Sequence, residues 1–145
     1  MNYKLRQAVI GDSQVIRRLV REARLNPFGL DWRRFTVAAT SQEGIIGCGQ
    51  VKSHRGGSRE LASIVVAPEW RDEGVSKGII NHLLSIHPLP IYLTCRSGMG
   101  EFYEKFGFKI INNDMPPYFK RVSWLVSLLK IAAPKRETLL VMKIQ

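Results

Sequence analysis

The stretch IVVAPEWRDEGVSKGIINHLL, residues Ile64 to Leu84, contains the turn around which the rest of the chain is organised. It begins inside the apolar, β-branched run 61–66, a pattern typical of a strand buried on both faces. Beyond the turn at 67–70, apolar residues recur at helical spacing and stop before Pro88: Val75, Ile79, Ile80, Leu83 and Leu84. The stretch therefore predicts a strand, a tight loop and a helix.

The loop before this helix has the features of a phosphate-binding turn. The first N–H groups of a helix lack intrahelical partners and carry the positive end of the helix dipole. Gly74 permits a close backbone approach or a positive φ, and Arg71 adds a positive side chain. We therefore expect an anion site at residues 71–76.

The composition is that of one globular domain with a basic surface. The 145 residues and 16.5 kDa suffice for a single core, and 45% hydrophobic with 23% charged residues exclude wholesale disorder. The net charge of +10 favours anionic partners such as acidic metabolites, nucleic acid or an anionic membrane surface, and disfavours free polyamines. The basic residues are spread along the chain without interleaved aromatics, which argues against nucleic acid.

The rest of the chain alternates strands and helices. An opening strand at 3–9 precedes a helix capped by Asp12 or Ser13, and the segment 30–34 is a short helix. The other predicted strands are 35–39, 45–51, 90–95, 108–111 and 138–144, and the other predicted helices are 99–106 and 121–131.

A second motif, FYEKFGF, covers Phe102 to Phe108. Met99, Phe102, Tyr103 and Phe106 recur on one face of the helix predicted there, which Gly107 closes. This apolar stripe by itself indicates packing.

Together the two motifs, RDEGVSKGI and FYEKFGF, resemble the GCN5-related N-acetyltransferase (GNAT) superfamily, and the element order is similar along nearly the whole chain. The resemblance implies an α/β fold with a mixed, mostly antiparallel twisted sheet and helices on both faces. It further implies a V-shaped splay between the two central strands and a single domain spanning 1–145. In this family the acyl-CoA lies in the gap at the splay.

The resemblance also implies which residues act. Tyr103 matches the tyrosine that protonates the CoA sulfur, although its apolar neighbours also allow a packing role. Glu60 stands where many members carry a glutamate base, although a solvated charge paired with Arg55 or Arg59 is an equal alternative. The residues implied in binding acetyl-CoA are Ile64, Val65, Val66, Arg71, Asp72, Glu73, Gly74, Val75, Ser76 and Lys77.

Three residues depart from the family pattern. Ser76 stands where glycine or alanine is usual, Asp72 where glycine is frequent, and Arg96 where an asparagine is common. Two carboxylates, Asp72 and Glu73, are unfavourable beside a pyrophosphate unless they point to solvent. Residues around Phe28, Trp32, Arg33 and Arg34 occupy the region that shapes acceptor specificity in this family, or else hold a loop onto the core.

The three histidines and two cysteines are too scattered to predict a metal site or a catalytic triad, so we assign no metal. Cys48 and Cys95 are expected to be buried thiols in a reducing compartment. The N-terminal residues have no uninterrupted apolar segment typical of a secretion signal, so we expect a cytoplasmic protein.

The segment 120–133 is a basic amphipathic insertion. Val122, Leu125, Val126 and Leu129 form an apolar face that Trp124 and Leu128 widen. Burial against the sheet or in a homodimer is the favoured interpretation, with contact to an anionic membrane as the alternative.

These patterns predict an acetyl-CoA-dependent N-acetyltransferase that transfers acetyl directly to a primary amine of a small molecule or protein. The alternative is a catalytically inactive member of the same fold that senses CoA or binds nucleic acid or another partner.

Overall fold

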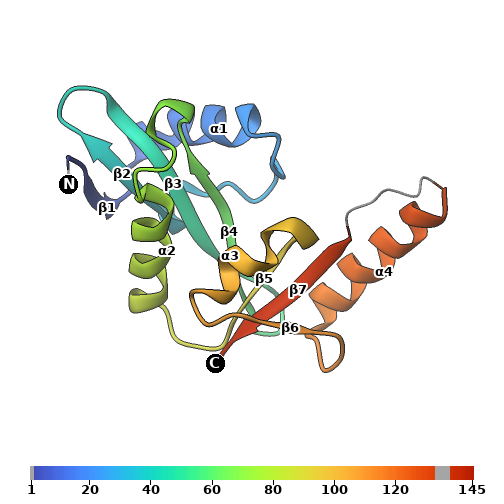
Figure 1. Ribbon diagram of the computed structural model, residues 1–145. Helices are drawn as coiled ribbons and strands as arrows, with labels where there is room; N and C mark the ends of the chain where they lie inside the picture. Colours follow the sequence, from blue (N-terminus) through green and yellow to red (C-terminus); the bar gives the residue numbers. More distant parts are fainter. Residues whose placement is uncertain (1, 133–137) are drawn as a thin grey trace. The chain divides into compact units, whose positions relative to one another are not determined.

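The computed structural model of the protein describes residues 2–132 and 138–145, with the side chains of 129–132 outside the description (Figure 1). The chain divides into two compact units. The first contains Met1–Lys52 and Leu61–Pro88, and the second contains Ser53–Glu60 and Leu89–Gln145. Within the described residues, no helix is both long enough and apolar enough to cross a lipid bilayer.

The first unit contains a sheet in the strand order β1-β2-β3-β4. Its strands are β1 (Lys4–Gln7), β2 (Phe35–Thr40), β3 (Gly44–Ser53) and β4 (Arg59–Val66), of which β3 and β4 each extend into the second unit at one end. β2 pairs antiparallel with both β1 and β3, and its register with β3 shifts between Ala38 and Ala39. The β2–β3 hairpin closes through the turn predicted at 41–44.

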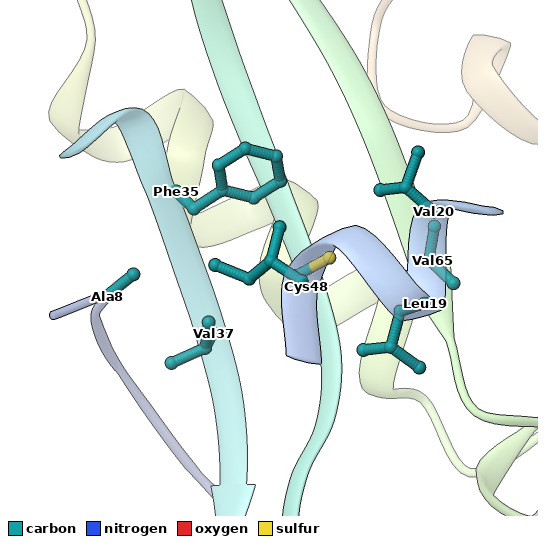
Figure 2. Packing of buried hydrophobic residues seen from close by; sticks show 8 residues of the cluster. Ala8, Leu19, Val20, Phe35, Val37, Cys48 and Val65 are labelled. Atoms are coloured by element: carbon teal, nitrogen blue, oxygen red, sulfur yellow. The ribbon is translucent and has the colours of Figure 1, made fainter. Parts of the chain in front are cut away.

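Two helices cover opposite faces of this sheet. On one face α1 (Ser13–Glu22) contributes Ile16, Leu19 and Val20 to a core whose strand residues include Phe35 and Cys48 (Figure 2). On the other face lies α2 (Val75–Ile86): a Cβ added to Gly49 of β3 would lie 2.8 Å from Cγ2 of Ile79. Adjacent residues of a strand point to opposite faces, so small glycines at 47 and 49 admit α2 while Cys48 faces α1.

Asp12 precedes α1 as predicted, but its carboxylate does not cap the helix. It accepts two bonds from the Arg6 guanidinium, at 2.7 and 3.2 Å, and one from the Val9 N–H at 2.8 Å. The bond from Arg6 is the main reason that the pKa of Asp12 lies below its usual value. The side chain therefore fastens β1 to the short 3-10 helix Ile10–Asp12.

The second unit contains the strands β5 (Ile91–Arg96), β6 (Lys109–Ile111) and β7 (Leu139–Ile144) in the order β5-β7-β6, both pairs antiparallel. The start of β4 belongs here too, because Glu60 pairs with Tyr92 of β5 in the parallel sense. The helices are α3 (Gly100–Glu104) and α4 (Pro117–Ala132). Tyr92, Phe119 and Val141 form the core of this unit.

The regular part of α3 is shorter than predicted. The helix ends at Glu104 because the next N–H groups turn back, with Gly107 donating to the Glu104 carbonyl at 3.0 Å and Phe108 to the Tyr103 carbonyl at 3.4 Å. This is the hydrogen-bond pattern of a Schellman cap, and Gly107 adopts the positive φ of 105° that it requires. The cap fixes the direction of Tyr103 and Phe108.

α4 begins at Pro117 rather than at Arg121, since a proline at the first helical position has no N–H to leave unpaired. Its apolar face is buried only in part: Val122 and Val126 are half-buried, whereas Trp124 is 62% exposed and Leu125 52%. The first turn of α4, with Phe119, supplies the fully buried contact to the core. The homodimer interpretation stays a prediction.

Candidate functional site

The predicted phosphate loop lies in the first unit. The 3-10 helix Pro68–Trp70 leads to Asp72 and Gly74, which both adopt positive φ angles, 64° and 78°. Such angles are easy for glycine and tolerated by aspartate. Asp72 thus adopts a backbone conformation that a glycine would also allow. The carboxylates of Asp72 and Glu73 are exposed, as an anion site requires.

Beyond the loop, the N-terminus of α2 offers free backbone donors. The first intrahelical hydrogen bond runs from the Gly78 N–H to the Gly74 carbonyl at 3.0 Å, so the N–H groups of 75–77 have no helical partner. A Cβ added at Gly74 would meet no atom within 4 Å, which means that open space adjoins these donors. The residues present therefore fit a phosphate group.

Tyr3 is a residue of this loop region that the sequence did not reveal. Its hydroxyl donates to the Gly74 carbonyl at 3.3 Å and would lie 2.5 Å from a Cβ added at Gly78. Gly78 is therefore small because the N-terminal segment passes over α2 there. The only signal for this contact in the sequence is an apolar helix position occupied by glycine.

The strand β4 is irregular where the family resemblance places backbone contacts to the pantetheine arm. Ser63 has a φ of 59°, and its hydroxyl accepts from the Gln50 side chain at 2.9 Å. A left-handed residue in a strand disrupts the ladder locally and bends the strand. Of the three residues that follow, only Val65 is buried, at 6% exposure, whereas Ile64 and Val66 are half-buried.

Tyr103 lies on α3 in the second unit, among aromatic rings. Its ring centroid is 5.0 Å from that of Phe102 and 6.1 Å from that of Phe108, both edge to face. Burial, together with the nearby Cys95 thiol, raises the pKa of Tyr103 to about 12. The phenol therefore keeps its proton at neutral pH, so the packing role and a proton-donor role are compatible.

Glu60 is not the solvated charge that was the alternative from the sequence. Its side chain is buried, and Oε1 lies 2.8 Å from Nε2 of His54. Neither Arg55 nor Arg59 forms an ion pair with it within the described residues. The scattered histidines had predicted no such pair, because the turn at 54–58 brings together two residues six positions apart.

Aromatic side chains from α4 and β5 surround this pair. The His54 and Tyr118 rings stack, with centroids 3.7 Å apart, and the Phe119 ring meets His54 edge to face at 5.8 Å. Tyr92 in turn packs on Phe119 at 5.1 Å. The inserted helix α4 thus supplies part of the environment of Glu60, a role that its sequence did not suggest.

The acceptor-region residues behave differently from one another. Trp32 packs against the core of the first unit, and the Arg33 guanidinium lies over its ring, 5.1 Å from the centroid. Phe28 is 77% exposed, so it does not hold its loop onto the core. The loop is fastened instead by the Lys52 ammonium, which donates to the Phe28 carbonyl at 3.3 Å.

The two thiols are expected to differ in reactivity. Burial raises the pKa of Cys48 to about 12, so hardly any of its thiolate exists at pH 8. Burial also raises the pKa of Cys95, but this thiol is less buried. We expect Ellman's reagent to modify at most Cys95 in the native protein and both thiols after unfolding in guanidinium. A native Cys95→Ser variant that reacts rapidly would contradict this prediction.

The structure separates the predicted residues by unit. All ten predicted cofactor-binding residues, 64–66 and 71–77, belong to the first unit, whereas Tyr103 and Glu60 both belong to the second. Arg96, at the end of β5, is exposed and has an interaction partner. Within the described residues, no three side chains of the metal-ligating types gather to hold an ion.

Comparisons with known proteins agree with the resemblance. The model of the acetyltransferase (GNAT) domain family matches residues 31–110, more than half of the chain. A Mycobacterium tuberculosis protein, Rv2747, solved in complex with CoA, is 18% identical with a TM-score of 0.73, the match covering 97% of this chain and 98% of that one. No curated protein sequence matches this chain.

Two further solved structures have the same fold. N-acetylglutamate synthase from Neisseria gonorrhoeae, complexed with coenzyme A and N-acetyl-glutamate, is 19% identical with a TM-score of 0.71. The match covers 99% of this chain but 35% of that one, so this chain spans about a third of that enzyme. Ard1 from Thermoplasma volcanium is 14% identical with a TM-score of 0.69, covering 99% of this chain and 97% of that one. These likenesses establish the mixed α/β fold predicted from the sequence.

Proposed function

The chain belongs to the acetyltransferase (GNAT) domain family, and on that premise we propose that it is an N-acetyltransferase that moves an acetyl group from acetyl-CoA to a primary amine. The observation that carries the proposal is the open, donor-lined turn at the N-terminus of α2, in a chain that also holds a buried carboxylate and a protonated phenol. The family model includes residues of both units, which supports treating 1–145 as one catalytic domain.

In this proposal the loop and the start of α2 hold the phosphates. The N–H groups of Val75, Ser76 and Lys77 donate to the pyrophosphate, and Arg71 adds a charge-assisted bond from its exposed side chain. The backbone of Ile64, Val65 and Val66, beyond the bend at Ser63, pairs with the pantetheine arm as an added strand. When bound, acetyl-CoA supplies an activated acyl thioester.

The residues of the second unit perform the proton transfers. Glu60, together with the histidine that its carboxylate holds, forms the general base that frees the lone pair of the amine for attack on the acyl carbon. As the carbon–sulfur bond breaks, the Tyr103 phenol donates its proton to the departing sulfur, and the proton lost by the new amide nitrogen restores the phenol. One proton is released to solvent for each ammonium consumed.

We propose that the protein acts in the cytoplasm. We also propose an acceptor that carries an acidic group beside its amine. The net charge of +10 supports this class over polycations. The similar N-acetylglutamate synthase was solved with a product of this kind, N-acetyl-glutamate. A panel of amino acids, with spermidine as the opposite charge class, tests the proposal.

Calorimetric titration of the purified protein with acetyl-CoA tests the function itself. We expect micromolar binding, about −8 kcal/mol, with ADP weaker and desulfo-CoA similar. Acetyl-CoA-dependent thiol release with an amine then measures turnover. No acetyl-CoA binding at all would overturn the proposal and leave an inactive binding module of the same fold.

Removing the charge of Arg71 is expected to weaken binding without unfolding the protein. Arg71 is exposed, so Arg71→Ala loses a charge-assisted bond of about 1.5–2 kcal/mol, or roughly a 10- to 30-fold rise in the Kd of acetyl-CoA. Arg17→Ala on α1 is the matched control, because it removes the same charge from an exposed helix position. Equal effects in the two variants would mean that only the general field of the protein matters.

A further inference from the structure

The loop that connects β3 to β4 presents a histidine whose two ring nitrogens have different surroundings. Nε2 of His54 lies 2.8 Å from the carboxylate Oε1 of Glu60. A carboxylate accepts hydrogen bonds and does not donate them, so Nε2 carries a proton and, in the neutral ring, Nδ1 carries the lone pair. Within the described residues, Nδ1 forms no hydrogen bond with a protein atom, and the His54 side chain is 15% exposed.

The His54 ring is also held in one orientation by aromatic neighbours. It stacks on Tyr118 with an interplanar angle of 15°, and Phe119 closes its edge. The backbone of the loop is a tight turn, because the His54 N–H donates to the Ser58 carbonyl at 2.9 Å and the Gly57 N–H donates to the His54 carbonyl at 3.0 Å. The orientation of Nδ1 is therefore set by three elements: the loop, β4 and α4.

We propose that His54 is the group that takes the proton of the acceptor amine, and that Glu60 is a positioning residue that orients the imidazole and stabilises its charged form. This inference deepens the proposed acetyltransferase function and rests on it. A carboxylate that holds one imidazole nitrogen while the other acts as base is the arrangement of catalytic triads. Here the Glu60 side chain is only 8% exposed, so its bond to His54 is largely shielded from water.

The proton step balances without a further reactant. The bond between the ammonium nitrogen and one hydrogen breaks, and that proton forms a bond to Nδ1. The nitrogen keeps the electron pair, which then attacks the acyl carbon. The resulting imidazolium donates its Nε2–H to the Glu60 carboxylate, forming a buried ion pair, and Nδ1 later returns the proton to solvent.

Ionisable groups near the ring belong to β4 and α4. Glu60 faces it from β4, and Tyr118 and Arg121 belong to α4. Burial and the Glu60 charge raise the pKa of Tyr118, while Arg121 lowers it, so Tyr118 is a neutral phenol at neutral pH. Arg55 is the arginine of the loop itself, and Arg59 is the first residue of β4.

His54→Gln is the first test, because the glutamine amide can still donate to Glu60 but offers no basic nitrogen. We expect kcat/KM to fall by about 100-fold, while the Kd of acetyl-CoA stays within about twofold. The lower inflection of the kcat/KM–pH profile should disappear. His82→Gln on α2 is the matched control and should leave both constants unchanged.

Glu60→Gln separates the two roles. An amide oxygen still accepts from Nε2, so the ring remains placed and only the carboxylate charge is lost. We expect a loss of about tenfold in kcat/KM, because the imidazolium loses its ion pair, while the lower inflection of the kcat/KM–pH profile is retained. If Glu60 itself is the base, Glu60→Gln will cost at least as much as His54→Gln and the inflection will vanish.

Nitrogen-15 NMR of the imidazoles gives a readout that needs no substrate. In the ligand-free protein, we expect the neutral His54 ring as the Nε2–H tautomer. An Nδ1–H tautomer, or a His54→Gln variant with wild-type turnover, would overturn the role of His54 alone. A wild-type protein that neither binds acetyl-CoA nor acetylates any amine would overturn the proposed function, whatever the tautomer is.

Discussion

Replacing Tyr103 with phenylalanine is expected to lower kcat by about 100-fold while the Kd of acetyl-CoA stays within about twofold. The change removes one hydroxyl from a half-buried ring and keeps the edge-to-face contacts with Phe102 and Phe108. Because the pKa of Tyr103 is raised to about 12, the phenol holds its proton throughout the neutral range and can give it to the departing sulfur. Steady-state kinetics and calorimetry measure the two constants.

Tyr92→Phe is the matched control for this experiment. Tyr92 is buried in the same unit on β5, and the structure gives its hydroxyl no role in the proposed chemistry. The control should retain turnover within about threefold. If Tyr103→Phe also retains it, Tyr103 only packs, as its apolar neighbours allow. A rise in the Kd of acetyl-CoA with unchanged kcat would instead assign the hydroxyl to cofactor binding.

Truncating Phe119 to alanine is expected to lower the free energy of unfolding by about 3–4 kcal/mol. The side chain is fully buried, and its ring contacts Tyr92, Tyr118 and His54. The cavity would remove the packing that joins the first turn of α4 to the core of the second unit. Guanidinium denaturation followed by tryptophan fluorescence and circular dichroism measures the change.

Leu125→Ala on the same helix is the control, because Leu125 is 52% exposed and should cost less than about 1 kcal/mol. Similar losses in both variants would mean that the exposed face of α4 is covered in solution, as in the homodimer predicted from the sequence. A loss below about 1 kcal/mol for Phe119→Ala would contradict the packing described here. Size-exclusion chromatography of the wild-type protein separates these two explanations.

Much of the fold follows from local patterns in the sequence. The strand, loop and helix around Gly74 form as predicted, with α2 beginning at Val75, because helical periodicity and a glycine with positive φ are local requirements. The strands on either side of the hairpin turn at 41–44 are also confirmed, because strand and turn patterns are local as well. The bounds of α3 and α4 differ from the prediction because caps decide them: a Schellman turn shortens α3, and Pro117 extends α4 at its start.

The candidate site depended on the sequence in a different way. The motif around Arg71 and the tyrosine of FYEKFGF predicted two site regions, which in the structure are a turn with open space at Gly74 and a half-buried phenol. Their roles stay predictions. Glu60 was predicted as a site residue from its position at the start of the central strand, but its partner His54 was not predicted. A histidine six residues away in a loop carries no periodic signal, so nothing local distinguishes His54 from His82 or His87.

The sequence by itself determined the element order and the glycine-containing turn before α2, because these depend on neighbours along the chain. Only the tertiary structure decided that Glu60 is buried against His54, that Tyr118 stacks on the histidine, and that the apolar face of α4 at Trp124 stays exposed. Burial and pairing depend on residues far apart in the chain, and their free energies appear only when packing has excluded water.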